Sequence, residues 1–416
     1  MSMDDGSLLA QTTAEDVARR SYGKLVAFLA VRTHDLTSAE DALSDAFLAA
    51  LADWPKNGCP QNPEAWLLTV ARRKAIDQLR GTRRHGLAAE DLRAVNDGLE
   101  AAETQTAIPD QRLALMFACA HPSIDPAVRA PLILQTVLGF DAKPIASAFL
   151  TSPAAMSKRL VRAKEKIKQA GIPFAIPEPE ELPERLDAVL DAIYAGFAEG
   201  WTDPAGTDEA RRDLTSESLF LAQLVTDLLP QNAEALGLLA LMSHAEARRG
   251  ARRTTQGEFV PLAEQDPELW DKELVQKAEM LLLQASKLHA PGRYQLEAAL
   301  QSAHVHRCRT GHWNWPEIVE LYDALFAITG SPVVALNRAL AVAETDGAAT
   351  GLKLLEKLTA DERLTGYQPY WAARAELLVR ANSPAEAREA YEIAIGLERD
   401  PAIRRFLQRR RAALPT

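Results

Sequence analysis

Two clusters of basic side chains are the groups in this sequence best suited to binding chemistry. The first consists of four cations in one helical pattern and two just after it: Arg72, Arg73, Lys74, Arg80, Arg83 and Arg84. The second contains six Lys and Arg residues against Glu165, all within residues 154–168. Cations grouped in this way attract phosphate oxygens, so both clusters indicate contact with a nucleic-acid backbone. A solvated helix face is the alternative, because basic charge alone does not separate the two.

The first cluster must be positioned by a pair of helices. An acidic helix comes first, with apolar residues at helical spacing: Ala39, Ala42, Leu43, Ala46, Phe47 and Ala50. Its other face carries Glu40, Asp41 and Asp45. A Pro/Asn loop over residues 54–63 follows, and Pro63 with Glu64 begins the basic helix. An earlier helix over residues 14–33, capped by Thr13, completes a compact helical domain after a loose tail at residues 1–12.

The pattern around the second cluster predicts that it lies on the last helix of a helix-turn-helix. We expect helices at 110–120, capped by Asp110, and at 126–138, with a kink or restart at Pro131. A short helix at 143–149 and a Ser152-Pro153 cap follow. In the last helix the buried seam is expected to be Met156, Leu160, Ala163 and Ile167. Residues near its N-terminus would reach base edges, and those further along would bind phosphates.

The motifs in these two regions resemble one protein family. Between Ala39 and Arg80 the sequence has Ala-Glu-Asp-Ala-x-x-Asp-Ala-Phe, a Trp, a Pro/Asn loop, and Pro-x-Ala-Trp-Leu-x-x-x-Ala-Arg-Arg-x-Ala-Ile-Asp-x-Leu-Arg. This is similar to the −10 domain of extracytoplasmic-function sigma factors of bacterial RNA polymerase, although Ser44 stands where many members carry Gln. Ser-Pro-x-x-Met-x-x-Arg-Leu-x-Arg-Ala-Lys-x-Lys-Ile, from Ser152 onward, resembles the −35 domain of the same family.

The resemblance implies partners and site residues. The acidic helix would dock on the clamp coiled coil of the polymerase β′ subunit, and the second domain on the β flap. Docking residues would be Glu40, Asp41, Asp45 and Phe47. The loop matches the one that captures a flipped base, for which a rigid frame with amide groups is suited. Contacts to the −10 element would come from Lys56, Asn57, Gln61, Asn62, Trp66, Arg72, Arg73 and Arg80. Contacts to the −35 element would come from Ser152, Ala154, Ala155, Ser157, Lys158, Arg159, Arg162 and Lys166.

The C-terminal half has a different pattern. A hinge rich in Pro and Glu over residues 173–183 leads into successive helical segments up to residue 412. Small residues alternate with large apolar ones on helix pairs, above all at 370–379 with 385–395, as in tetratricopeptide repeats. A subset of the same sigma factors carries such an extension, and this chain resembles that subset. Stacked helix pairs of this kind offer a surface for a protein segment, from this chain or from a partner.

Charge and composition agree with this division. The net charge is −10, but residues 1–174 have 21 Lys and Arg against 20 Asp and Glu, so the acidity belongs to the remainder. Three well-separated cysteines, Cys59, Cys119 and Cys308, indicate no disulfide framework. No signal peptide or membrane segment is evident, so a cytoplasmic location is the expectation.

Sites for other chemistry are weak. His304, Cys308 and His312 could share a helix face, but ordinary packing is favoured over metal binding, and we expect no metal and no cofactor. No phosphate loop, Gly-x-Ser-x-Gly motif or His-Glu-x-x-His motif occurs. Because no catalytic constellation is found, we expect a protein that is not an enzyme.

The sequence therefore predicts an all-α sigma factor that directs polymerase to promoters. The predicted parts are a −10 and docking domain at 1–84, a linker at 85–109, a helix-turn-helix domain at 110–172, a hinge at 173–183 and a tetratricopeptide-like domain at 184–416. Two alternatives stay open. One is a stand-alone helix-turn-helix regulator, for which the acidic docking helix would have no use. The other is a helical-repeat scaffold, whose affinity need not fall steeply with salt.

Overall fold

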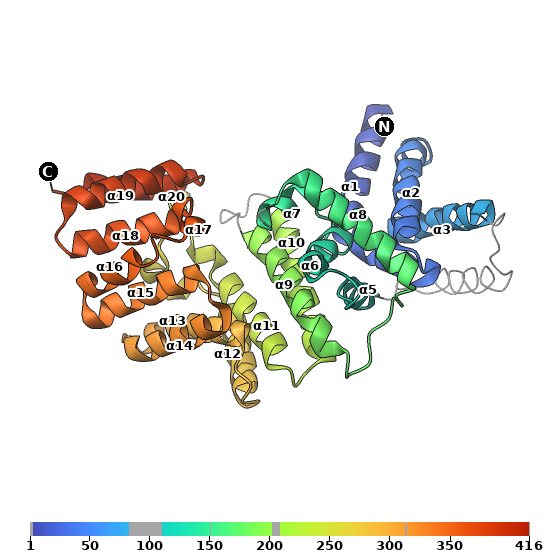
Figure 1. The fold of residues 1–416 in the computed structure, drawn as a ribbon. Helices are drawn as coiled ribbons and strands as arrows, with labels where there is room; N and C mark the ends of the chain where they lie inside the picture. Colours follow the sequence, from blue (N-terminus) through green and yellow to red (C-terminus); the bar gives the residue numbers. More distant parts are fainter. Residues whose placement is uncertain (1–2, 83–109, 150, 202–208, 313, 416) are drawn as a thin grey trace. The chain divides into compact units, whose positions relative to one another are not determined.

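The computed structural model describes residues 3–82, 110–149, 151–201, 209–312 and 314–415. In these ranges the chain forms helices and no strand, so the predicted all-α class is confirmed (Figure 1). One isolated β-bridge joins Arg253 and Phe259. None of the helices in these ranges combines the length and the apolar character that crossing a bilayer requires. The predicted linker at 85–109, together with Arg83 and Arg84, lies outside the described residues.

The chain divides into two compact units, residues 1–203 with 208–224 and residues 204–207 with 225–416. The first begins with α1 (Met3–Thr33), α2 (Leu36–Asn57) and α3 (Pro63–Thr82), which pack on one another. The part predicted to be a helix-turn-helix domain, called the helix-turn-helix part below, follows as α5 (Arg112–Cys119), α6 (Pro126–Thr136), α7 (Ala142–Ala148) and α8 (Pro153–Ala170). Then come α9 (Leu182–Trp201) and most of α10 (Glu209–Leu228).

The start of α1 and the course of α6 differ from the sequence-based expectations. The predicted loose tail is helical, because α1 begins at Met3 and passes through Thr13. Thr13 is therefore no cap, and its hydroxyl donates instead to the Leu9 carbonyl 2.8 Å away. Of the kink or restart predicted at Pro131, the restart does not occur, since α6 runs through this residue as one helix, and the kink stays a prediction. Pro131 lacks an N–H, but one missing hydrogen bond is tolerated in a helix buried on several sides.

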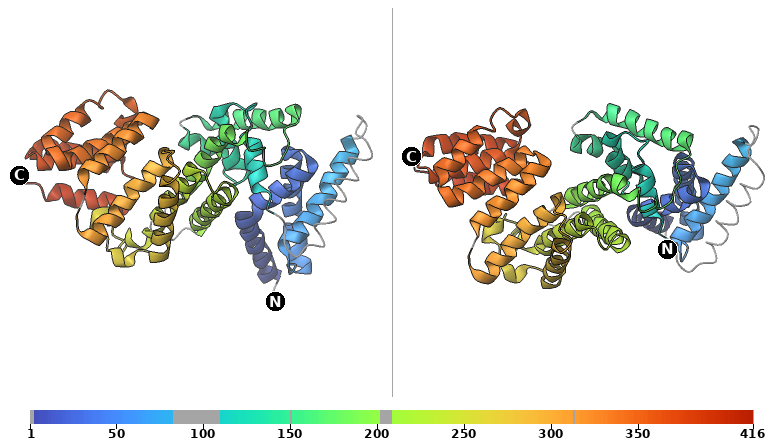
Figure 2. Two further views of the ribbon diagram at one scale, coloured as in Figure 1. Left: turned by 90° about the horizontal axis from the view of Figure 1, so that it is seen from below. Right: turned by 60° about the horizontal axis from the view of Figure 1, so that its bottom comes forward.

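The second unit is a succession of helices that pack on their sequence neighbours. Its helices are α11 (Ala233–Ala247), α12 (Lys272–Ser286), α13 (Arg293–Thr310), α14 (Trp315–Thr329), α15 (Pro332–Asp346), α16 (Ala348–Glu356), α17 (Glu362–Thr365), α18 (Gln368–Arg380), α19 (Pro384–Leu397) and α20 (Pro401–Ala412). Figure 2 shows α13 to α19 following one another as stacked pairs. The helical segments predicted from periodicity are confirmed, whereas the 3₁₀ turns between α11 and α12 and the short α17 were missed.

Alanines make close stacking possible in this unit. One cluster of buried residues joins α18, α19 and α20 through Ala375, Ala387, Ala390, Tyr391 and Leu407. Small side chains let helix axes approach, and the large apolar ones fill the remaining space. The alternation of small and large residues seen in the sequence therefore corresponds to the interior of helix pairs.

Candidate nucleic-acid interface and docking helix

Helix α8 has well-defined ends and one buried side. Ser152 is its N-cap, with the Ala155 N–H donating to the Ser152 hydroxyl at 3.3 Å, and Pro153 is its first residue. Gly171 ends the helix in the left-handed conformation, with φ of 60°. The buried residues are Met156, Leu160, Ala163 and Ile167, so the predicted seam is confirmed. With this seam fixed, the opposite side of the helix is directed outward.

Four cations lie on the outward side of α8. Lys158, Arg159, Arg162 and Lys166 are all exposed, as is Ser157 near the N-terminus. Within the described part of the chain, none of these four cations has a carboxylate within 4 Å. Arg159 lines a pocket of about 410 Å³ together with Asp187 and Asp191 of α9. Ser152 and Ala154 are exposed and Ala155 is half-buried, although the Ser152 hydroxyl is engaged in capping.

The loop predicted for base capture is shorter than expected. Helix α2 continues through Pro55 to Asn57, so Lys56 and Asn57 belong to its last turn. The Asn57 side-chain amide donates to Asp53 at 2.7 Å, and Gly58, with φ of 86°, ends the helix. Pro55 is compatible with helical φ, which is why the proline did not stop the helix. The connection is therefore residues 58–62, a correction to the predicted loop at 54–63.

The remaining −10 candidates lie in this connection and on α3. Gln61 is exposed, and Asn62 caps α3 by accepting the Ala65 N–H at 3.1 Å. Trp66 is half-buried and meets the buried Trp54 edge to face, with ring centroids 5.4 Å apart. This aromatic pair joins the end of α2 to the start of α3 and holds the short connection in place.

The cations of α3 follow the same helix. Arg72 is half-buried and Arg73 is exposed. Lys74 lies 3.8 Å from Asp45 of α2. Arg80 belongs to α3, but its side chain lies outside the described residues. The first basic cluster is thus partly paired with the acidic helix beside it, which is the main difference from α8.

The four predicted docking residues of α2 have four different environments. Asp41 is exposed, and Asp45 is half-exposed beside Lys74. Phe47 is half-buried and lines an apolar groove of about 410 Å³ against α1. Glu40 is held by the Lys164 ammonium group of α8, which donates to both carboxylate oxygens at 2.8 and 2.7 Å.

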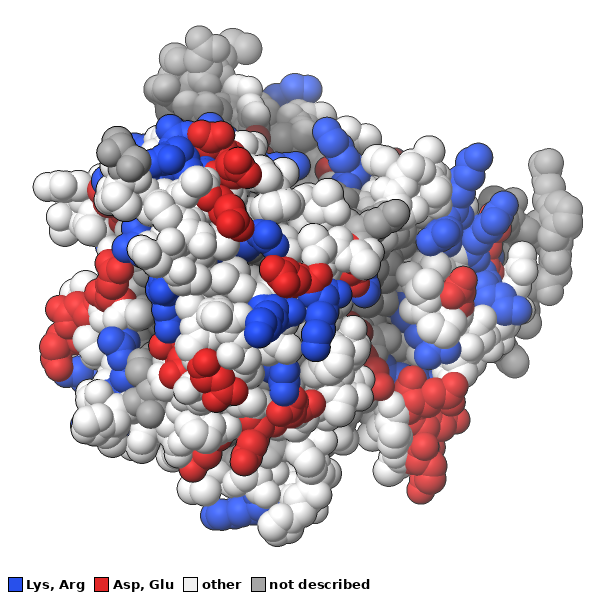
Figure 3. Space-filling view, turned by 60° about the vertical axis from the view of Figure 1, so that its left-hand side comes forward, with Lys and Arg blue, Asp and Glu red and all other residues white. Residues whose placement is uncertain are grey.

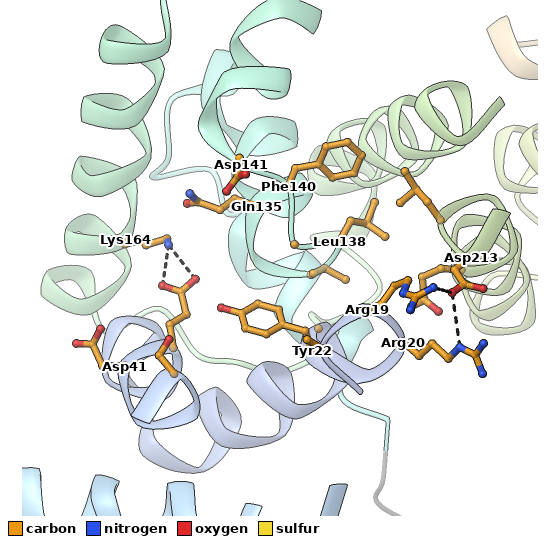
Figure 4. Close-up of a pocket in the computed structure, with 18 residues that line it drawn as sticks. Arg19, Arg20, Tyr22, Asp41, Gln135, Leu138, Phe140, Asp141, Lys164 and Asp213 are labelled. Atoms are coloured by element: carbon orange, nitrogen blue, oxygen red, sulfur yellow. Dashed lines mark hydrogen bonds and ion pairs between the residues drawn. The ribbon is translucent and has the colours of Figure 1, made fainter. Parts of the chain in front are cut away.

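The Glu40–Lys164 pair lies beside a cavity of about 690 Å³ within the first unit, formed by α1, α2, α6, α8 and α10 (Figure 4). Burial raises the pKa of Glu40, and this effect outweighs the lowering by Lys164. Burial, followed by the charges of Glu40 and Asp41, raises the pKa of Tyr22 to about 12. On another side of the cavity Asp213 lies within 3.6 Å of Arg19 and of Arg20. No sequence pattern indicated that Lys164 pairs with Glu40 of α2, because these two residues are 124 positions apart.

The helix-turn-helix part also depends on α9 and α10. Arg112 of α5 is buried and forms ion pairs with Asp110 and with Glu217 of α10. The Arg129 guanidinium, from α6, donates to the Ile124 and Pro122 carbonyls at 3.0 and 3.1 Å and lies 3.5 Å from the Glu184 carbonyl. A methyl group at Gly196 of α9 would come within 2.6 Å of Leu138. Helices α9 and α10 therefore complete the packing of the helix-turn-helix part.

The histidines of α13 do not converge. Burial is the main cause that lowers the pKa of His304, to about 3, followed by nearby arginines. Cys308 is exposed, and no group of three His, Cys, Asp or Glu side chains in the described ranges is arranged to hold a metal ion. His304 thus has the environment of a neutral packing residue.

Two parts of the chain match known protein families. Residues 17–85 match the sigma-70 region 2 family, and residues 185–286 match a family of unknown function, DUF6596. An uncharacterized protein of Rhizobium meliloti (strain 1021) is 37% identical over 372 residues, which is 87% of this chain and 86% of that protein. A probable RNA polymerase sigma factor, RfaY, of Xanthomonas campestris pv. campestris is 27% identical over 216 residues, 49% of this chain and 50% of that protein. No solved structure matches the chain.

The chain belongs to the sigma-70 family, and it is a member of the same family as the Rhizobium protein. The sigma-70 region 2 match covers α2, α3 and most of α1. Membership implies a role in transcription initiation, in which a sigma factor binds core RNA polymerase and promoter DNA. The DUF6596 match begins in α9 and ends at the last residue of α12.

Proposed function

We propose that this protein is a sigma factor of the extracytoplasmic-function type that works in the cytoplasm and directs polymerase to a specific set of promoters. In this proposal α2 docks on the clamp coiled coil of the β′ subunit and the helix-turn-helix part docks on the β flap. The connection at 58–62 and the exposed side of α3 recognise the −10 element, and α8 recognises the −35 element. The catalysis of RNA synthesis belongs to the polymerase.

The observation that carries the proposal is the outward side of α8. Four cations lie on one side of this helix without carboxylate partners within 4 Å in the described chain, so their charge is available to the phosphates of a DNA groove. The opposite side is anchored by four apolar residues, so the helix can present this surface in a fixed orientation. The N-terminal turn, with Ala154, Ala155 and Ser157, would approach base edges.

For the second unit we propose a regulatory or partner-binding role. Its helix pairs are similar to tetratricopeptide repeats in their alternation of small and large buried residues. Such stacked pairs bind protein segments on an extended surface, and catalysis is rare among them. Its occupant would be another protein or a segment of this chain.

Run-off transcription with purified core polymerase tests the main proposal. The full chain should give discrete transcripts from a library of promoter fragments. A shortened chain should end after Leu228 and not after Ala170, because α9 and α10 cover α5 and α6. Comparing it with the full chain measures whether the second unit activates or restrains initiation. If the protein shifts DNA but no transcript appears with polymerase present, a stand-alone regulator is the better account.

The docking role of α2 is tested by Asp41→Lys with Asp45→Lys. Both carboxylates are at least partly exposed, so the double variant should fold, yet its affinity for core polymerase should fall by about tenfold or more. Glu178→Lys with Glu180→Lys is the matched control, since it makes the same change of charge at exposed positions of the hinge. Equal affinities of the two variants for polymerase would remove α2 from the docking surface.

A further inference from the structure

Helix α8 contacts the predicted docking helix through buried charge. The Lys164 and Glu40 side chains are only 14% and 16% exposed, and both carboxylate oxygens of Glu40 accept hydrogen bonds from Lys164. One turn further along α8, Lys168 lies 2.7 Å from Asp35, the N-cap of α2. The contact therefore joins the last turns of α8 to the first turns of α2. Figure 4 shows Lys164 directed across the edge of the cavity toward α2.

A second close contact also joins the part of the first unit formed by α1–α3 to the part formed by α5–α8. Gly23, in the middle of α1, lies against the turn that follows α6. A methyl group at this position would overlap the carbonyl oxygen of Val137 and come within 2.9 Å of its carbonyl carbon. Backbone atoms cannot move aside as a flexible side chain can, so this packing requires glycine.

We propose that two contacts, the Lys164–Glu40 pair between α8 and α2 and the packing of Gly23 of α1 against Val137, form an autoinhibitory latch. This latch hides Glu40 from RNA polymerase until the first unit opens. The inference rests on the proposed function, because it takes α2 as the docking helix. The Glu40 side chain is only 16% exposed and Lys164 binds both of its carboxylate oxygens, so a polymerase group can reach this carboxylate only after Lys164 moves away. Separating a buried pair without replacing both partners is strongly unfavourable.

The latch leaves the proposed DNA surface open. Lys158, Arg159, Arg162 and Lys166 are exposed on α8 while Lys164 is engaged. The apparent affinity for polymerase should therefore equal the affinity of the open form multiplied by the fraction of molecules that are open. The affinity of α8 for a short duplex should not depend on closure. This separation distinguishes a latch from a general change in folding.

Lys164→Ala and Gly23→Ala in the full chain test the latch from two sides. Neither residue is among the proposed docking or DNA contacts. Ala is a better helix former than Gly, so Gly23→Ala does not weaken α1 itself. Both variants should bind core polymerase, without DNA, about tenfold more tightly, and small-angle X-ray scattering should show a larger radius of gyration. Their affinity for a −35 duplex should match that of the unchanged protein.

The controls keep the helix and the type of change constant. Glu165→Ala removes a charged side chain of α8 that is exposed and lies outside the proposed docking and DNA contacts. Gly396→Ala, in α19, adds the same methyl group where no atom lies within 4 Å. Neither control should alter the polymerase affinity or the scattering.

Each other outcome overturns the latch. If Lys164→Ala and Gly23→Ala expand the protein without tightening polymerase binding, Glu40 is not masked. Unchanged scattering with unchanged affinity would mean that the contact does not hold the unit closed. If the unchanged protein and all variants fail to bind polymerase, the proposed function fails and the latch with it. That result differs from failure of the latch alone, in which the unchanged protein still binds.

Discussion

Helices α8 and α20 are both rich in cations, yet their charges have different surroundings. The outward cations of α8 have no carboxylate within 4 Å in the described chain. On α20, Arg405 and Arg409 share Glu258, Arg410 pairs with Glu376, and Arg411 pairs with Glu392. Figure 3 shows Lys and Arg interspersed with Asp and Glu on the face that it draws. A basic helix is therefore a candidate DNA surface only where its own fold leaves the charges available.

Reversing charges on the two helices should give the largest contrast. Lys158→Glu with Arg162→Glu on α8 should lower the affinity for a −35 duplex by about 100-fold, because two phosphate contacts are lost and two repulsions are introduced. Arg405→Glu with Arg409→Glu on α20 makes the same change of charge and should leave that affinity within about twofold. Fluorescence anisotropy with a labelled duplex measures both. Comparable losses of duplex affinity in the two variants would show that α8 is no better a DNA surface than α20.

Removing a carboxylate next to α20 should affect stability and not DNA binding. Glu376 accepts the hydroxyl hydrogen bond of the buried Tyr391 and pairs with Arg410. Glu376→Ala leaves both partners unsatisfied and should cost about 1–3 kcal/mol in the free energy of unfolding. Glu344→Ala removes the partner of the exposed Arg380 and should cost about 0–1 kcal/mol. Urea unfolding of the two variants makes the comparison, and equal midpoints would contradict it.

Removing one cation from α8 tests whether it binds phosphate. Arg162→Ala should weaken binding to all duplex sequences similarly, by up to about tenfold, and reduce the slope of log K against log salt by about one. Arg411→Ala, on α20, is the control and should leave the slope unchanged. An unchanged slope for Arg162→Ala would exclude this residue from the phosphate contacts.

The smallest effect is expected for the partly exposed ion pair between Lys168 of α8 and Asp35. Burial raises the pKa of Asp35, but the hydrogen bonds from Lys168 and Ser38 outweigh it, and the pKa is lowered overall. A lowered folded pKa stabilises the protein above the unfolded value of about 3.9, and this contribution is lost as the pH falls through the folded pKa. Because Lys168 is largely exposed, Lys168→Ala should cost about 0–1 kcal/mol at pH 7. In urea unfolding this cost should shrink as the pH is lowered from 7 to below the unfolded value of about 3.9, and a cost that does not change with pH would contradict the titration of Asp35.

Local patterns in the sequence predicted most of this fold. Period-3.6 spacing identified the seam of α8 and the helices of the second unit, because each depends on residues within a few turns. The start of α1 was missed because Thr13 is acceptable both as a cap and inside a helix. The end of α2 was missed because Pro55 lies in a helical last turn, where proline usually indicates a loop.

Long-range contacts could not be predicted in the same way. Lys164 and Glu40, and likewise Arg112 and Glu217, are each about a hundred residues apart, and no local spacing relates them. The outward cations of α8 were identified from the sequence, but their lack of carboxylate partners required the positions of every neighbouring helix. The candidate site was thus predicted as a set of residues, and its accessibility was not.

The dependence of α5 and α6 on α9 and α10 has a consequence for synthesis on the ribosome. When Ala170 leaves the exit tunnel, the helix-turn-helix part is complete in sequence, but Arg112 still lacks Glu217 and Leu138 still lacks Gly196. The first unit ends at Leu224, about fifty residues later, which takes several seconds at ordinary translation rates. During that interval the nascent chain exposes apolar surface of α6 that the finished protein covers. The order of synthesis therefore makes α5–α8 a part of the protein that completes its folding late.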